Sequence, residues 1–321
     1  MTRSRFLPDN LTLLLITTVI TASFLPCTGV VAQGFEILTT FMIGLLFFLH
    51  GAKLSREQAM AGLMHWKLHL TVLTFTFAVF PLLGLILKPA LLWMVTPDLY
   101  IGFLYLCVLP STVQSSIAFT AVARGNVPAA VCSASASNLL GIFLTPLLVG
   151  LIVVSNNAAH SSSGAILTII YQLLLPFVAG QIARRWIGRW VDSHKAMLKV
   201  VDQSSILLVV YVAFSAAVIQ GLWSQLPLTS LFGILGVSAI LLGLLIGLSM
   251  YASRRFGFAK EDEITIVFCG SKKSLASGVP MAKVLFSSHT VGVILLPLMI
   301  FHQLQLMVCA VLAQHYAQRK P

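Results

Sequence analysis

The sequence predicts an all-α polytopic membrane protein of ten transmembrane helices, arranged as two inverted five-helix repeats. Of its 321 residues, 58% are hydrophobic and only 9% are charged, whereas a soluble domain has about 25% charged residues. The apolar residues form runs of about 20 residues, the length that a helix needs to cross a bilayer. This pattern excludes soluble enzymes, fibres and disordered chains.

Each predicted helix is an apolar window bounded by charged residues or by clusters of Gly, Pro and Ser. The windows, in chain order, are 10–28, 34–52, 67–88, 99–122, 127–154, 164–186, 202–222, 228–252, 262–286 and 290–314. The five cysteines lie in or next to these windows without paired spacing, so neither a disulfide framework nor a metal site is predicted.

The basic residues predict the orientation of the chain, because cytoplasmic loops are enriched in Lys and Arg. With the N-terminus inside, only Lys88 and Lys283 fall outside, and Lys272 and Lys273 fall within a span. The remaining basic residues all fall on the cytoplasmic side: Arg3, Arg5, Lys53, Arg56, Lys67, Arg124, Arg184, Arg185, Arg189, Lys195, Lys199, Arg254, Arg255, Lys260, Arg319 and Lys320. We therefore predict a multi-pass protein of the cytoplasmic (inner) membrane with both termini cytoplasmic.

The net charge of +11 does not indicate a nucleic-acid partner, because the basic residues are spread between the spans instead of forming one stripe. The predicted partners are the lipid bilayer and a small solute. The sequence leaves the oligomeric state open.

A Ser- and Asn-rich stretch at 155–163 divides the windows five and five, and we interpret it as an extracytoplasmic linker. The two halves, 1–154 and 164–321, then have opposite orientations, which is the inverted-repeat plan of many secondary transporters. The fourth window of each half is interrupted by polar residues, at 110–116 and at 269–278. Interrupted helices at matching positions indicate a binding site near the bilayer midplane.

Two adjacent lysines, Lys272 and Lys273, lie within the second interruption. A lysine at the centre of a transmembrane helix costs about 2.5–3.5 kcal/mol on insertion scales, so such residues usually face a cavity or a partner. Adjacent helical residues point about 100° apart, so the two lysines are expected to have different partners. The alternative is that both lie nearer the interface and extend their ammonium groups to it.

Polar side chains near the two interruptions are further candidates for a substrate or ion site, because unwound backbone and hydroxyl groups can bind ions there. The candidates are Ser111, Thr112, Gln114, Ser115, Ser116, Asn138, Ser271, Ser274 and His302, the last with Gln303 and Gln305 nearby. For the serines the alternative is close helix packing. For His302 it is an interhelical hydrogen bond instead of a proton relay.

Enzyme chemistry is not predicted, and no residue is a catalytic candidate. The sequence has no nucleophile-elbow, zinc-protease or phosphate-loop motif. Every Asp and Glu falls at the end of a predicted span or in a loop, which argues against a cation antiporter based on carboxylates.

Several segments resemble the bile acid:sodium symporter superfamily, and in particular its SBF-like branch, over essentially the whole chain. The segments are Ala123-Arg-Gly-Asn-Val127, Leu144-Thr-Pro-Leu-Leu148, the Gly-Ser-Lys-Lys-Ser run within 266–286, and Pro297-Leu-Met-Ile-Phe-His302. The resemblance implies a panel domain and a core domain with crossing interrupted helices. It also implies transport of an organic anion together with sodium.

The chain departs from the sodium ligands that this resemblance implies. The fourth-span Ser-Asn pair falls near Ser115 and Ser116, and the fifth-span hydroxyl positions fall on Ala130 and Ala134. In the ninth span a Glu position falls on Phe268 or Cys269, and Lys272 and Lys273 replace a Gln-Asn pair. We therefore predict no resident cofactor and hypothesise that Lys273, or Lys272, replaces bound sodium, and that deprotonation of such a desolvated lysine can couple transport to protons.

The function predicted from these features is secondary transport of a small organic, anionic solute by alternating access. The alternative is a membrane regulatory or scaffold protein that keeps the transporter fold without transport. A closed, dry crossing region beside the two lysines favours that alternative, and a substrate-sized cavity favours transport.

Overall fold

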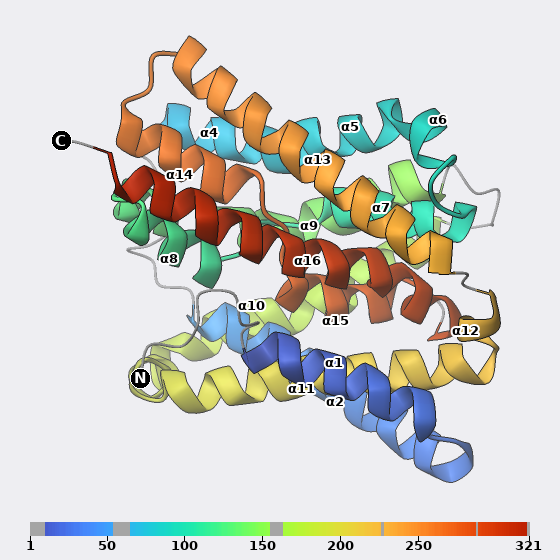
Figure 1. Cartoon of the computed structure of the whole chain (residues 1–321). Helices are drawn as coiled ribbons and strands as arrows, with labels where there is room; N and C mark the ends of the chain where they lie inside the picture. Colours follow the sequence, from blue (N-terminus) through green and yellow to red (C-terminus); the bar gives the residue numbers. More distant parts are fainter. Residues whose placement is uncertain (1–9, 54–64, 155–162, 226–227, 287, 320–321) are drawn as a thin grey trace, which may run out of the picture. The chain divides into compact units, whose positions relative to one another are not determined.

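The computed structural model describes residues 10–53, 65–154, 163–225, 228–286 and 288–319, and the regular elements in these ranges are all helices (Figure 1). Six helical segments are long and apolar enough to cross a membrane: Gly29–Lys53, Trp66–Ile86, Val127–Ile152, Lys195–Ile219, Thr229–Arg255 and Thr290–Ala317. The predicted all-helical membrane class is therefore confirmed, whereas the ten crossings and the inverted repeats stay predictions. The predicted linker at 155–163 lies outside the described residues, apart from Ser163.

Helices lie within all ten predicted windows. In chain order they are α1 (Asn10–Phe24), α2 (Gly29–Lys53), α4 (Trp66–Thr74), the π-helical turn η1 (Phe75–Val79), α5 (Phe80–Ile86), α6 (Lys88–Leu91), α7 (Pro97–Val108), α8 (Gln114–Val122), α9 (Val127–Leu148), η2 (Val149–Val154), α10 (Ser163–Ser193), α11 (Lys195–Ile219), α12 (Leu222–Gln225), α13 (Leu228–Arg255), α14 (Lys260–Gly270), α15 (Leu275–Leu285) and α16 (Ser288–Ala317). Helices α10 and α11 extend beyond the apolar windows, so charged residues continue both helices past the predicted boundaries.

The helices form two compact units that interleave along the sequence. The first unit combines α1, α2, α11 and α12 with most of α10, with α15 from Val279 and with α16 as far as Leu295. The second unit contains α4 to α9, α13, α14, the start of α15 and the rest of α16. Each unit thus draws on both halves of the chain.

In the first unit, α11 packs against both α1 and α2. The hydroxyl of Tyr211 on α11 donates a hydrogen bond of 2.8 Å to the Leu25 carbonyl just after α1. Helices α2 and α10 approach closely at Gly180, where a Cβ would overlap the backbone carbonyl of Phe48. At the end of α2, the ammonium of Lys53 lies 2.5 Å from the carboxylate of Asp202 on α11. Small residues and an ion pair therefore hold this unit together.

Helix α2 begins earlier than the apolar window predicts, because Gly29 adopts a positive φ of 58° that favours glycine and turns the chain after α1. Glu36 consequently lies inside the helix instead of near its end. Its carboxylate is 2.7 Å from the ammonium of Lys283 on α15, also in the first unit. A carboxylate inside a candidate span is thus neutralised by a lysine that the sequence places at the outer end of the ninth window.

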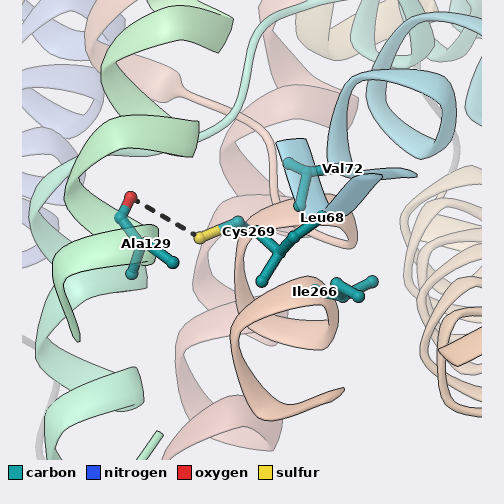
Figure 2. Packing of buried hydrophobic residues seen from close by; sticks show 6 residues of the cluster. Leu68, Val72, Ala129, Ile266 and Cys269 are labelled. Atoms are coloured by element: carbon teal, nitrogen blue, oxygen red, sulfur yellow. Dashed lines mark hydrogen bonds between the residues drawn. The ribbon is translucent and has the colours of Figure 1, made fainter. Parts of the chain in front are cut away.

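In the second unit, α14 is the central helix and packs against α4, α8, α9 and α13. Figure 2 shows one of its contacts, where Cys269 and Ile266 meet Leu68 and Val72 of α4 and the small Ala129 of α9. The Cys269 thiol points to the neighbouring Ala130 carbonyl at 3.9 Å. Because alanines occupy this face of α9, α14 can approach its backbone closely.

The first turn of α14 is tied to its neighbours by Glu263, which is buried. The Glu263 carboxylate accepts from Lys260 at 2.7 Å and from the Tyr316 hydroxyl of α16 at 3.1 Å. Arg254, at the end of α13, donates to the same carboxylate at 3.3 Å. These contacts hold the N-terminal end of α14 in place.

Candidate functional site

Two helix interruptions meet inside the second unit. Helix α7 ends at Val108, where Leu109 becomes extended and Pro110 has no N–H with which to continue the helix, and α8 begins only at Gln114. Between α14 and α15, residues 271–274 are not helical. The backbone N–H of Ser274 donates to the Pro110 carbonyl at 2.9 Å, so the two unwound segments are joined directly.

The end of α7 and the first unwound segment leave backbone carbonyls without helical partners, and buried carbonyls need donors. Side chains or backbone of distant segments supply a donor for each carbonyl from 107 to 111. The donors are Lys273 Nζ for Cys107 and Leu109, the Thr145 hydroxyl for Val108, the Ser274 N–H for Pro110, and the Asn138 amide for Ser111. The five carbonyls from 107 to 111 therefore all have hydrogen-bond donors from other parts of the chain.

Lys273 is fully buried, and its ammonium makes three hydrogen bonds to backbone carbonyls. It donates to Thr76 at 2.7 Å, to Cys107 at 2.8 Å and to Leu109 at 2.7 Å. It also lies 4.2 Å from the centre of the Phe80 ring. Since an ammonium has three donors, Lys273 is saturated by oxygen acceptors, much as a bound cation would be.

The Thr76 carbonyl is free to accept Lys273 because of the local sequence of η1. The Phe80 N–H, which would bond Thr76 in an α-helix, bonds Phe75 instead. The next residue, which would bond Thr76 in a π-helix, is Pro81 and has no N–H. A π-turn followed by proline thus opens one carbonyl toward the lysine.

Lys272 is equally buried and has different partners, as predicted, although both lysines lie in the unwound segment and not on a helix. Its ammonium donates to the Ser115 carbonyl at 3.0 Å. It lies 4.0 Å from the centre of the Phe119 ring and 5.3 Å from that of Phe268. Cation–π contacts of this kind stabilise a desolvated cation. The alternative that both lysines reach the interface is wrong, because neither side chain is exposed.

Gln305 holds the unwound backbone of Lys273 in place, and it is absent from the predicted site. Its side-chain oxygen accepts from the Lys273 N–H at 2.9 Å, and its amide nitrogen donates to the Lys273 carbonyl at 2.9 Å. The same nitrogen lies 2.8 Å from Nδ1 of His302, one turn earlier on α16. His302 therefore reaches the site through Gln305.

The remaining predicted polar residues hold the two interruptions together. Ser111 donates to the Cys269 carbonyl at 2.5 Å and Ser116 donates to the Phe268 carbonyl at 2.8 Å. The hydroxyl of Thr112 lies 2.8 Å from that of Ser115 and 2.9 Å from that of Ser116. These side chains thus line the junction between α8 and α14.

Three further predicted residues differ in their roles. Ser271 donates back to the Val267 carbonyl of its own helix at 2.6 Å. The Ser274 hydroxyl accepts from the Ser277 N–H at 3.1 Å and so caps the start of α15. Gln114, at the start of α8, is exposed and lies apart from the buried hydroxyls.

Asn138 uses its whole amide group to join α9 to both interruptions. Its nitrogen donates to the Ser111 carbonyl at 2.7 Å and to the Ala134 carbonyl at 3.0 Å, and its oxygen accepts from the Ser277 hydroxyl at 2.8 Å. An amide in an apolar environment needs hydrogen-bond partners, and here the protein itself supplies them.

We expect Asn138→Ala to lower the free energy of unfolding by about 1–3 kcal/mol, because it leaves the buried Ser111 carbonyl without a donor. The measurement is the thermal unfolding midpoint of the purified protein in detergent. Ser135→Ala, one turn earlier on α9, is the matched control and should have a smaller effect. Equal midpoints for Asn138→Ala and the native protein would contradict this role.

The fifth-span hydroxyl positions and the ninth-span Glu position of the resemblance are occupied by apolar side chains here. Ala130 and Ala134 are fully buried, as are Phe268 and Cys269. Ala130 packs in the same cluster as Cys269. These side chains offer no hydroxyl or carboxylate oxygen to a cation.

Comparison with known proteins identifies the family. Residues 9–318 match the SBF-like CPA transporter family. PA2026, an uncharacterized protein of Pseudomonas aeruginosa, is 64% identical over 320 residues, which cover 100% of this chain and 96% of the relative. YfeH of Escherichia coli, named as a candidate symporter, is 57% identical over 97% of this chain and 93% of its own length. Sodium/bile acid cotransporter 7 of Danio rerio is 30% identical over 86% of this chain and 83% of its own length.

The family and the relatives with functional names are transporters, so this protein is a transporter and not an enzyme, as the sequence predicts. The apolar helices of both units place it in a membrane, which it crosses several times. The resemblance to the SBF-like branch is confirmed over nearly the whole chain. The chain therefore belongs to the SBF-like CPA transporter family.

Proposed function

We propose that this protein moves a small organic anion by alternating access, with a buried lysine ammonium in the place of the sodium ion. The observation that carries the proposal is the binding of Lys273 Nζ by the carbonyls of Thr76, Cys107 and Leu109. Carbonyls of unwound helices are the groups that coordinate sodium in many secondary transporters. A fixed ammonium can hold the same segments together without a sodium gradient.

The apolar residues at the expected sodium positions support the proposal. A sodium site needs several oxygen ligands, and Ala130, Ala134, Phe268 and Cys269 supply no side-chain oxygen. The Ser115 and Ser116 hydroxyls are the nearest equivalents of the Ser-Asn pair, and Ser116 is already bonded to the Phe268 carbonyl. We infer that the sodium sites of the symporters are incomplete in this chain.

The charge of the site supports an anion as the substrate. Lys272 and Lys273 are both buried in the second unit. Among the described residues, no carboxylate forms an ion pair with either lysine. An opposite charge on the solute would therefore be stabilised near them.

The proposed arrangement in the membrane is ten crossings in two inverted repeats, within a cytoplasmic (inner) membrane and with both termini cytoplasmic. Helices in all ten apolar windows and the bias of Lys and Arg to one side support it. The interruptions at corresponding positions of the two halves support the inverted repeat.

The first test compares the thermal stability of the purified protein in sodium and potassium at constant ionic strength. A sodium site would stabilise the folded protein by about 2.7 kcal/mol at 100 times its dissociation constant. We expect equal unfolding midpoints in the two salts. A saturable rise specific to sodium would contradict the proposal and restore sodium symport.

A second test asks for uptake by proteoliposomes that contain the native protein, Lys273→Gln or Lys272→Gln, with a panel of small carboxylates and sulfonates as solutes. We expect saturable uptake of at least one anion by the native protein. Unaltered folding and unaltered uptake across pH in both variants would discard the lysine hypothesis.

The full burial of both lysines favours one other function, a regulatory or scaffold protein that retains the transporter fold. A transporter of this kind must open the site in another conformation, whereas a scaffold need not. Binding of an anion to the native protein distinguishes the two, because only the transporter has a solute that stabilises it.

A further inference from the structure

The two adjacent lysines differ in how many hydrogen-bond acceptors they meet. Lys273 has three carbonyl acceptors for its three N–H donors. Among the described residues, the Lys272 ammonium has one, the Ser115 carbonyl, and its other near neighbours are the rings of Phe119 and Phe268. Lys273 is therefore saturated and Lys272 is not.

This difference decides which lysine can release a proton with little change in structure. A neutral Lys273 would have two donors for three carbonyls, so one buried carbonyl would face a nitrogen lone pair. A neutral Lys272 would keep its single hydrogen bond to Ser115 and would lose only the attraction of its charge to two rings. Loss of the proton is thus compatible with the observed packing around Lys272 and not with that around Lys273.

The other groups that face Lys272 do not hold its charge in place. The titratable groups that interact with its ammonium are the thiols of Cys269 on α14 and Cys309 on α16. From α8 it meets the Ser115 carbonyl and the Phe119 ring. Lys273 is adjacent in the sequence, but its ammonium binds other carbonyls, and among the described residues no carboxylate forms an ion pair with Lys272. The Cys309 and Phe268 side chains belong to one apolar cluster between α14 and α16.

We infer that Lys272 is the proton-exchange site of this protein and that Lys273 is a permanently charged structural cation. The inference rests on the proposed transport function, which it extends from an unspecified lysine to two lysines with separate roles. In each transport cycle, Lys272 binds and releases a proton. Lys273 keeps its charge and holds the unwound segments together throughout the cycle.

The test measures charge movement in reconstituted protein on a solid-supported membrane, with protons as the only ligand. Rapid pH jumps across the neutral to alkaline range are applied in potassium buffer without any organic solute. We expect the native protein to give a transient current, because protonation of a buried amine moves charge within the membrane. Lys272→Gln should reduce the current to the level of liposomes without protein, while the variant keeps a native elution profile and unfolding midpoint.

Lys88→Gln is the matched control, because the Lys88 ammonium also lies over an aromatic ring, 5.8 Å from the centre of Tyr100, but belongs to the short helix α6. It should retain the full current. A folded Lys272→Gln protein with an undiminished current would overturn the inference, as would a native protein without any current. Neither result bears on anion uptake, and a sodium jump in the same apparatus reports separately on the proposed replacement of sodium.

Lys273→Gln completes the experiment, since a glutamine amide can still donate to two of the three carbonyls. If it is folded, we expect its proton-dependent current to exceed that of Lys272→Gln. Loss of the current in a folded Lys273→Gln protein, with retention in Lys272→Gln, would reverse the two roles and overturn the inference. If Lys273→Gln does not fold, the comparison of the currents of Lys272→Gln and Lys88→Gln still tests whether Lys272 is the proton-exchange site.

Discussion

We expect Lys273→Met to lower the free energy of unfolding by about 3 kcal/mol or more, because three buried carbonyls lose their donor. Each buried acceptor without a partner costs about 1–3 kcal/mol. Methionine has a similar length and avoids the cost of burying a charge, which offsets part of the loss. The carbonyl of Thr76 lacks a backbone donor because of the π-turn and Pro81, and those of Cys107 and Leu109 lack one because α7 ends there.

The measurement is the unfolding midpoint of the purified protein in detergent, together with the yield of monodisperse protein. Lys272→Met is the matched control, because it makes the same change at the neighbouring residue and removes a hydrogen bond to only one carbonyl, that of Ser115 in α8. We expect a clearly smaller loss for Lys272→Met. Equal losses in the two variants would show that burial of charge, and not the number of carbonyls, determines stability here.

Gln305→Leu should lower the free energy of unfolding by about 2–4 kcal/mol, although it changes neither lysine. Leucine has a similar size but leaves both the N–H and the carbonyl of Lys273 without partners in a buried, unwound segment. The side chain of Gln305 is fully buried, so water is not at hand to replace it.

The same unfolding measurement tests this expectation, with Gln303→Leu as the control on another side of α16. Gln303→Leu makes the identical change two residues away and should have a weaker effect. If the two variants have equal midpoints, the contact of Gln305 with the Lys273 backbone does not stabilise the interruption.

The sequence predicts the two interruptions because their signals are local. Pro110 and the polar residues after it cannot continue a helix in an apolar environment without loss of hydrogen bonds. The Gly-Ser-Lys-Lys-Ser run places two charges where a membrane helix rarely has them. For the same reason the lysines stand out without any structural information, whereas their different directions arise in the unwound segment 271–274, where helical geometry does not apply.

Local sequence signals do not predict the hydrogen-bond partners of the two lysines. Lys273 and Thr76 are separated by 197 residues, and no side chain of Thr76 takes part in the hydrogen bond. A backbone carbonyl looks the same at every position of a sequence, so only the fold reveals which one is unpaired. The Pro81 that frees this carbonyl appears in the sequence as an ordinary helix residue near a predicted boundary.

The role of Gln305 also cannot be predicted from the sequence alone. The sequence places it near His302 as one more polar residue of the last helix, with no sign that it differs from Gln303. Its role arises because the fold brings α16 against residue 273, where an unwound peptide needs one donor and one acceptor. Glu36 is a second case, since its lysine partner becomes evident only from the packing of α15 in the first unit.

Composition and hydropathy by themselves determined that this protein is helical and lies in a membrane, because apolar runs of this length are stable only as helices within a bilayer. Local motifs determined where the helices are interrupted and which family the chain resembles. The tertiary structure alone decided that Lys273 saturates three carbonyls while Lys272 meets one. The physical reason is that hydrogen bonds to the backbone depend on which carbonyls the fold leaves unpaired, and segments far apart in the sequence set that together.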